Sequence, residues 1–156
     1  MPHPVLSVEQ MRQWEARTWA GGVREEDVIR AAGRAVARQV EAMTRPGQRV
    51  LFLAGRGHNG DDAAWAHEFL SGRDKQLLRV LEPALEPLAA ALAHPVALVV
   101  DGLFGIGLNR ELSAAWVELI DRLNASGVPV LAVDVPSGLD AQTGRPCPRA
   151  VRALVT

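Results

Sequence analysis

The chain has 156 residues, 48% hydrophobic and 22% charged, with a formal net charge of -1. This composition is typical of one globular domain, residues 1–156, that buries a single core, and it offers neither a basic surface for nucleic acid nor an acidic tail. The longest apolar runs, at 88–93 and 96–100, are too short to cross a membrane and the N-terminus resembles no signal peptide, so we expect neither membrane insertion nor export.

Two helices are predicted before the first strand. Ser7 and Gln10 have the spacing of a capping box, which predicts a helix from Val8 to Trp19 that ends at a pair of glycines. In the next segment, 28–40, small and apolar residues recur every four positions, which predicts a second, amphipathic helix.

Strands then alternate with helices along the rest of the chain. Short apolar runs predict strands at 50–54, 77–81, 96–100 and 128–133, and the segment 151–155 is a candidate for the start of a fifth. Helices are expected at 63–70 and 84–93, and from a cap at Ser113 to a stop at Gly127. This alternation predicts an α/β fold, with a doubly wound, mostly parallel sheet and helices on both faces.

Three loops leave the carboxyl ends of the predicted strands, beginning at Gly55, Asp101 and Asp134. In a parallel sheet these ends share one edge, where open α/β sheets bind their ligands. An aspartate that ends a strand is more often a turn former than a functional group. Two of them beside a glycine-rich turn favour a polar site at this edge.

The loop after the first strand contains Gly55, Gly57 and Gly60 and then Asp61 and Asp62. A strand, a glycine-rich turn and a helix N-terminus in succession are typical of a phosphate site. The spacing matches neither the dinucleotide fingerprint nor the P-loop, which disfavours a dinucleotide-dependent oxidoreductase. The alternative, of about equal weight, is a tight turn in which Asp62 caps the following helix.

Few other reaction types are supported. Ser137 lies outside the nucleophile-elbow motif, His58 is expected to face solvent, and no zinc or calcium spacing occurs.

The only cysteine, Cys147, cannot form an intramolecular disulfide, which favours a cytoplasmic protein with a free thiol. Asn59, Asp101 and Ser137 could supply oxygen ligands to a hard monovalent cation.

Several motifs together resemble the NAD(P)H-hydrate epimerase family, also called the YjeF N-terminal domain. The resemblance rests on segments 9–11 and 32–37, on the first loop at 58–62, and above all on DGLFGIGL at 101–108 and DVPSGLD at 134–140. It implies a Rossmann-like three-layer domain that interconverts the R and S forms of hydrated NADH or NADPH, as nicotinamide nucleotide repair. It further implies a bound potassium ion and a homodimer.

Carried over by position, the resemblance also assigns the site. The potassium ligands would be Asn59, Asp101 and Ser137. Our own interpretation of the residues adds that Asp134 is the proton-transfer group, because epimerisation needs a group that can take and return a proton. Arg110 would be a charge partner for the substrate's pyrophosphate. The substrate-binding residues would be His58, Asn59, Gly60, Asp61, Asp62, Gly105, Ile106, Gly107, Leu108, Asn109, Arg110, Glu111 and Asp134.

The first loop departs from the family pattern, which usually has Asn-Asn-Gly-Gly-Asp-Gly where this chain has His58 to Ala63. Asp61 adds a carboxylate where the family has glycine, and a lysine that the family carries after the fifth strand is not found before Thr156. A second hypothesis therefore stays open, in which the domain has diverged and binds a nucleotide or a protein partner without catalysis.

Overall fold

A computed structural model describes residues 6–156 of the chain. Its centre is a four-stranded sheet made of β1 (Arg49–Ala54), β2 (Asp74–Arg79), β3 (Leu98–Gly102) and β4 (Val130–Ala132). The strand order is β2-β1-β3-β4 and every pairing is parallel. The predicted α/β class and parallel sheet are confirmed.

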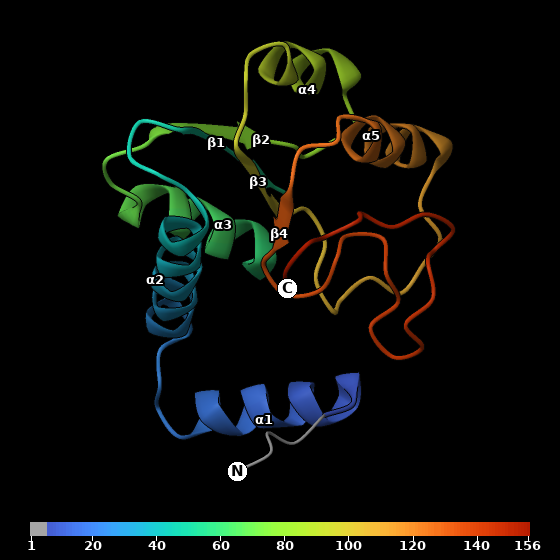
Figure 1. The fold of residues 1–156 in the computed structure, drawn as a ribbon. Helices are drawn as coiled ribbons and strands as arrows, with labels where there is room; N and C mark the ends of the chain where they lie inside the picture. Colours follow the sequence, from blue (N-terminus) through green and yellow to red (C-terminus); the bar gives the residue numbers. More distant parts are fainter. Residues whose placement is uncertain (1–5) are drawn as a thin grey trace.

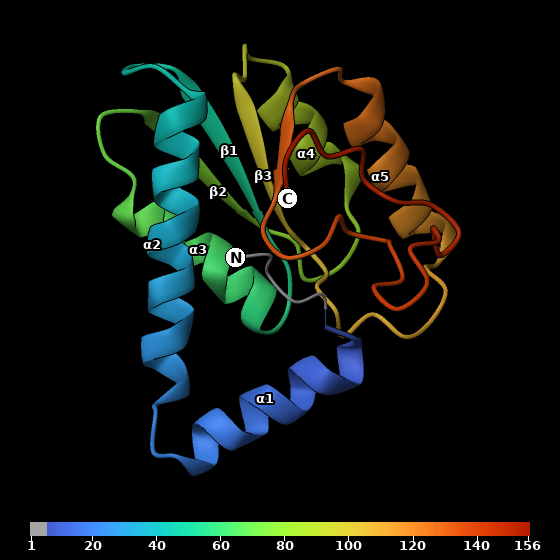
Figure 2. The same ribbon diagram turned by 60° about the horizontal axis from the view of Figure 1, so that its bottom comes forward.

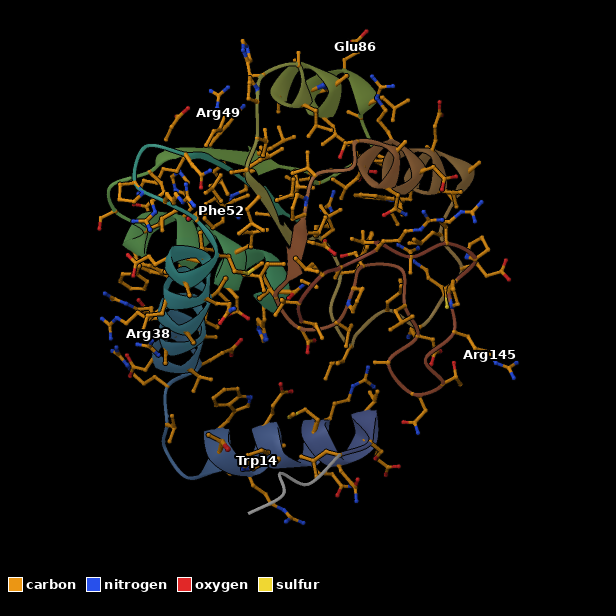
Figure 3. All side chains as sticks on the ribbon, viewed as in Figure 1. Trp14, Arg38, Arg49, Phe52, Glu86 and Arg145 are labelled. Atoms are coloured by element: carbon orange, nitrogen blue, oxygen red, sulfur yellow. The ribbon has the colours of Figure 1, made fainter. Side chains whose placement is uncertain are left out.

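Helices cover both faces of the sheet (Figure 1). One face carries α2 (Glu25–Met43) and α3 (His58–Phe69), and the other carries α4 (Leu85–Leu92) and α5 (Ala114–Ala125). Because successive side chains of a strand point to opposite faces, β1 contributes side chains to two hydrophobic cores, one on each face of the sheet. Phe52, in the interior in Figure 3, packs with the α2 and α3 side, whereas Leu51 and Leu53 pack with the α4 and α5 side.

The first helix, α1 (Val8–Ala20), starts as predicted, because Ser7 and Gln10 form a reciprocal capping box. The Gln10 amide donates to the Ser7 hydroxyl at 3.2 Å, and the Ser7 amide donates to the Gln10 side chain at 2.8 Å. None of its residues is buried. It lies apart from the sheet, below the carboxyl ends of the strands in Figure 2. No helix within the described range combines the length and the apolar character that a membrane crossing needs.

Predicted boundaries were wrong for three strands, and β4 is Val130–Ala132 where 128–133 was expected. β2 starts three residues earlier than expected, because this edge strand is polar at its start and its residues are only partly buried. β3 includes Asp101 and Gly102, which were expected to follow it. In the C-terminal segment, the described residues form only an isolated bridge between Val155 and Leu131 and no fifth strand.

The prediction for the start of α3 was also wrong. The helix begins at His58, five residues before the expected segment, and its N-cap is Gly57, with φ 75° and no side-chain cap hydrogen bond. A positive φ at this position favours glycine, since side chains are strained there. Asp62 is therefore not a helix cap, and the residues expected in a loop form the first turns of a helix.

Candidate functional site

A cavity of about 680 Å³ lies at the carboxyl ends of the strands, where the three predicted loops meet. Each loop contributes to its wall: α3 and the turn before it, the segment after β3, and the end of β4. The remaining wall comes from α1 and α2. The lining residues are Met11, Arg12, Glu15, Ala32, Ala35, Val36, Arg56, Gly57, His58, Asn59, Asp62, Gly105, Ile106, Gly107, Val133 and Asp134.

The first turn of α3 sits directly on the end of β1. A Cβ atom on Gly60 would lie 2.1 Å from the carbonyl oxygen of Gly55, so only glycine permits this approach. The contact places Asn59 at the cavity wall with 8% of its surface exposed. Neither its amide oxygen nor its amide nitrogen has a hydrogen-bond partner among the described residues. Asn59 therefore offers an unused buried oxygen beside the cavity.

Asp101 and Ser137 are fully buried behind the cavity wall and bind each other. The Ser137 hydroxyl donates to Oδ1 of Asp101 at 2.6 Å, and the Ser137 amide donates to Oδ2 at 2.9 Å. The amide of Leu103 adds a third donor at 3.2 Å. Burial raises the pKa of Asp101, while the hydrogen bonds from Ser137 and Leu103 oppose that rise.

Asp134 lies just beyond β4 and faces the cavity. Its Oδ2 accepts the amide of Ile106 at 2.9 Å, which joins the loop after β3 to the end of β4. A Cβ atom on Gly105 would lie 2.7 Å from the same oxygen, so the loop packs tightly against this carboxylate. The residue as a whole is exposed, but the surrounding protein still raises the pKa of its carboxyl, and the Ile106 amide opposes the rise.

Asp62 faces the same cavity from α3. Its Oδ1 is buried and has no hydrogen-bond partner within residues 6–156. Burial raises the pKa of Asp62 to about 7; the charges of Asp134 and Asp61 add to the rise and His58 opposes it. A carboxyl group with this pKa can both give and take a proton near neutral pH.

His58 and Asp61 have partners outside the cavity. The His58 ring is 57% exposed and contacts the carboxylate of Glu25 from α2, so it faces solvent in part, as expected. Asp61 turns away, because successive residues of a helix point about 100° apart. Its carboxylate lies 3.7 Å from Arg79 and lines a second cavity beside Trp65.

The loop after β3 divides between two cavities. Gly105, Ile106 and Gly107 line the main cavity, and Ile106 also lines a smaller neighbour of about 500 Å³ together with Leu108 and Asn109. Arg110 and Glu111 are exposed and line neither cavity. Of the substrate-binding residues assigned from the resemblance, those that do not line the main cavity are Gly60, Asp61, Leu108, Asn109, Arg110 and Glu111.

Sequence reasoning missed the wall made by the two N-terminal helices. Met11, Arg12 and Glu15 of α1 and Val36 of α2 line the main cavity. The sequence carries no signal for this wall, because α1 has no buried residue and its charged residues have the pattern of ordinary surface charges.

A family profile matches nearly the whole described chain. The profile is described as YjeF-related protein N-terminus, and it matches residues 25–92 and 79–156. The chain belongs to this family. The resemblance deduced from the sequence motifs is thereby confirmed.

Relatives of this YjeF-related chain carry informative names. A protein from Achromobacter xylosoxidans, named NAD(P)H-hydrate epimerase, is 42% identical in a gapped alignment of 173 positions, which covers 98% of this chain and 82% of the relative. One of the same name from Bordetella pertussis is 42% identical, with coverages of 89% and 68%. A Gloeobacter violaceus protein named bifunctional NAD(P)H-hydrate repair enzyme Nnr is 39% identical, but the matched region is only 32% of its length.

A solved structure agrees on the architecture of this YjeF-related domain. The crystal structure of yeast ynu0, YNL200c, superposes with a TM-score of 0.75 and covers 97% of this chain and 78% of the yeast chain. The sequences are 18% identical, so this likeness concerns the fold.

The raised pKa of Asp62 predicts a pH-dependent stability. An unfolded aspartate titrates near pH 4, whereas Asp62 in the folded chain titrates at about 7. Between these values the folded chain binds more protons than the unfolded chain, so the free energy of unfolding falls as pH rises. Asp62→Asn removes this term, so the variant should gain stability relative to wild type from about pH 4 to about pH 7. Urea unfolding at several pH values measures this gain, and a pH-independent difference would contradict it.

Proposed function

We propose that this chain is an isomerase that interconverts the R and S forms of hydrated NADH and NADPH. The support is the family membership, the names of relatives that are 42% identical over most of the chain, and a cavity that holds the means of proton transfer. The observation that carries the proposal is the position of Asp134, a carboxylate that faces the cavity from the end of β4. Its role is to take and return a proton at the hydroxyl group on the hydrated carbon.

The substrate's phosphates belong beside the segment Gly105 to Gly107. The Ile106 amide already donates to Asp134, which leaves the amides of Gly105 and Gly107 for an anion. Oriented backbone amides attract phosphate in this way. Arg12 and Arg56 line the same cavity and are better placed than Arg110 to balance the negative charge.

Potassium fits three residues at and directly behind the cavity wall. Asn59 has an unpartnered buried oxygen, Asp101 carries a buried carboxylate, and Ser137 adds a hydroxyl oxygen to the same cluster. These are the hard oxygen ligands that such a cation prefers, and its charge would offset the cost of burying Asp101. The ion would hold the three loops together and supply positive charge near the substrate's phosphates.

A homodimer is part of the same proposal. Among the described residues, large apolar side chains remain exposed on α1 and near the start of α2: Trp14 (labelled in Figure 3) at 59%, Val23 at 46% and Val28 at 39%. Covering this surface would remove apolar area from water. Light scattering should give twice the mass of one chain, and the mass of a single chain would contradict a stable dimer.

The direct test of the proposed activity is conversion of one purified epimer of hydrated NADH into the other, with the spontaneous rate subtracted. Asp134→Asn keeps the shape of the side chain but removes its proton-accepting group, so kcat should fall about 10²-fold or more. Asp121→Asn, on the surface of α5 and paired with Arg149, is the matched control and should convert at the wild-type rate.

Two results would contradict this account. If the wild-type chain does not exceed the spontaneous rate, the domain is a diverged binding module. If Asp134→Asn matches an active wild type, another group transfers the proton.

Potassium binding should appear as a gain in thermal stability. An ion that binds only the folded chain stabilises it by mass action, so Tm should be higher in potassium chloride than in tetramethylammonium chloride of equal ionic strength. Asn59→Ala removes one ligand and should reduce that difference. Equal Tm values in the two salts for wild type would rule out the ion.

A further inference from the structure

Two aspartates face the main cavity from different elements, Asp62 from α3 and Asp134 from the end of β4, and Glu15 of α1 lines it as well. Asp134 already uses Oδ2 to accept the Ile106 amide. Asp62 instead has a buried Oδ1 that accepts no hydrogen bond from any described residue. A buried acceptor without a partner is costly to the fold, and such groups are retained where a ligand uses them.

Epimerisation of the hydrate requires proton transfer on both faces of the ring, which a single carboxylate is poorly placed to provide. Water added to the double bond beside the ring nitrogen places the hydroxyl on the carbon bonded to that nitrogen. To invert this carbon, the hydroxyl must leave from one face of the ring and water must arrive at the other. One group must give a proton, and a second group must take one on the opposite face.

We propose that Asp62 is a second catalytic residue, which exchanges a proton with the substrate hydroxyl on one face of the ring while Asp134 does so on the other. This inference rests on the proposed epimerase function. Each aspartate would act on the face of the reacting carbon that lies toward its own wall of the cavity.

The reaction is balanced with one proton shared by the pair. Protonated Asp62 gives its proton to the hydroxyl, the C–O bond breaks with both electrons on oxygen, and water leaves. The lone pair of the ring nitrogen forms a C=N bond to the same carbon. A water molecule then adds to the other face, the C=N electrons return to nitrogen, and the added water loses a proton to ionised Asp134. The opposite epimer reacts by the same steps with the two carboxyl groups exchanged.

The electrostatics of the cavity favour a shared proton. The pKa of Asp62 is raised to about 7 by burial and by Asp134 and Asp61, and burial also raises the pKa of Asp134. Like charges in one site disfavour ionisation of both groups, so one carboxyl keeps its proton while the other is ionised. The other charged or titratable groups that line the cavity are Arg12, Glu15, Arg56 and His58.

The test compares Asp62→Asn and Asp62→Glu with wild type in the epimer-conversion assay. Asn keeps the shape of Asp62 without a transferable proton, so kcat should fall about 10²-fold or more while KM changes less than about threefold. Asp62→Glu restores a carboxyl group and should recover part of kcat. In water labelled with oxygen-18, product formed by wild type should carry the label, because the original hydroxyl leaves as water.

The controls separate this inference from the proposed function. Asp74→Asn changes a carboxylate that pairs with Arg49 at the start of β2 and should leave kcat at the wild-type value. Thermal unfolding of each variant shows whether it is folded. An active wild type with an equally active Asp62→Asn, a rise in KM alone, or product without label overturns the inference only. A wild type that does not exceed the spontaneous rate overturns the proposed function itself.

Discussion

The arrangement of the site depends on one buried carboxylate, Asp101. It sits at the end of a central strand with none of its surface exposed and accepts the amide and hydroxyl of Ser137 and the amide of Leu103. Leaving those donors unpaired would cost free energy comparable to lost hydrogen bonds, and so would leaving the carboxylate unpaired. The loop after β4 and the loop after β3 are therefore held together at one point.

The position of Asp134 follows from that attachment. The Ser137 hydroxyl also accepts the Phe104 amide at 2.9 Å, which fixes the loop two residues before Ile106. Ile106 in turn donates to Asp134. The carboxylate at the cavity is thus held through a chain of hydrogen bonds that begins at a fully buried residue. Such support allows a side chain on a loop to keep a defined position.

The opposite wall is set by packing against glycine. The contact between Gly60 and the backbone of Gly55 allows α3 to start directly at the end of β1, without a long loop. As a consequence Asn59 and Asp62 are held on a helix. Both turn buried polar atoms, which have no hydrogen-bond partner among residues 6–156, toward the region where the three loops meet. Burying these unpartnered polar groups lowers the stability of the fold. Such a loss is expected at a binding site that is already formed before its ligand arrives.

Much of this architecture could be predicted from the sequence. The apolar runs of β1, β3 and β4 indicate buried parallel strands, and that alone places the three loops at one edge. The start of α3 could not be predicted, because glycines that favour a loop by propensity are here required by close packing. The residue at which α3 starts sets the direction of each side chain on the helix. It therefore decides that Asp62, and not Asp61, faces the main cavity.

The part of the cavity wall that α1 forms could not be predicted from the sequence, for a different reason. A helix with no buried residue gives no packing signal for where it lies, and Arg12 and Glu15 look like ordinary surface charges. Their place beside the cavity follows from the path of the chain between α1 and α2. Tertiary arrangement of this kind leaves no periodic trace in the sequence.

The central claim is that the cavity bounded by Asp62, Asp134 and the segment Gly105 to Gly107 binds the nucleotide. A crystal structure of the chain with NADP⁺ tests it most directly. The account predicts the nicotinamide ring between the carboxyl groups of Asp62 and Asp134, with the phosphates beside the glycines. Electron density for the nucleotide in the second cavity, beside Trp65 and Asp61, would contradict it.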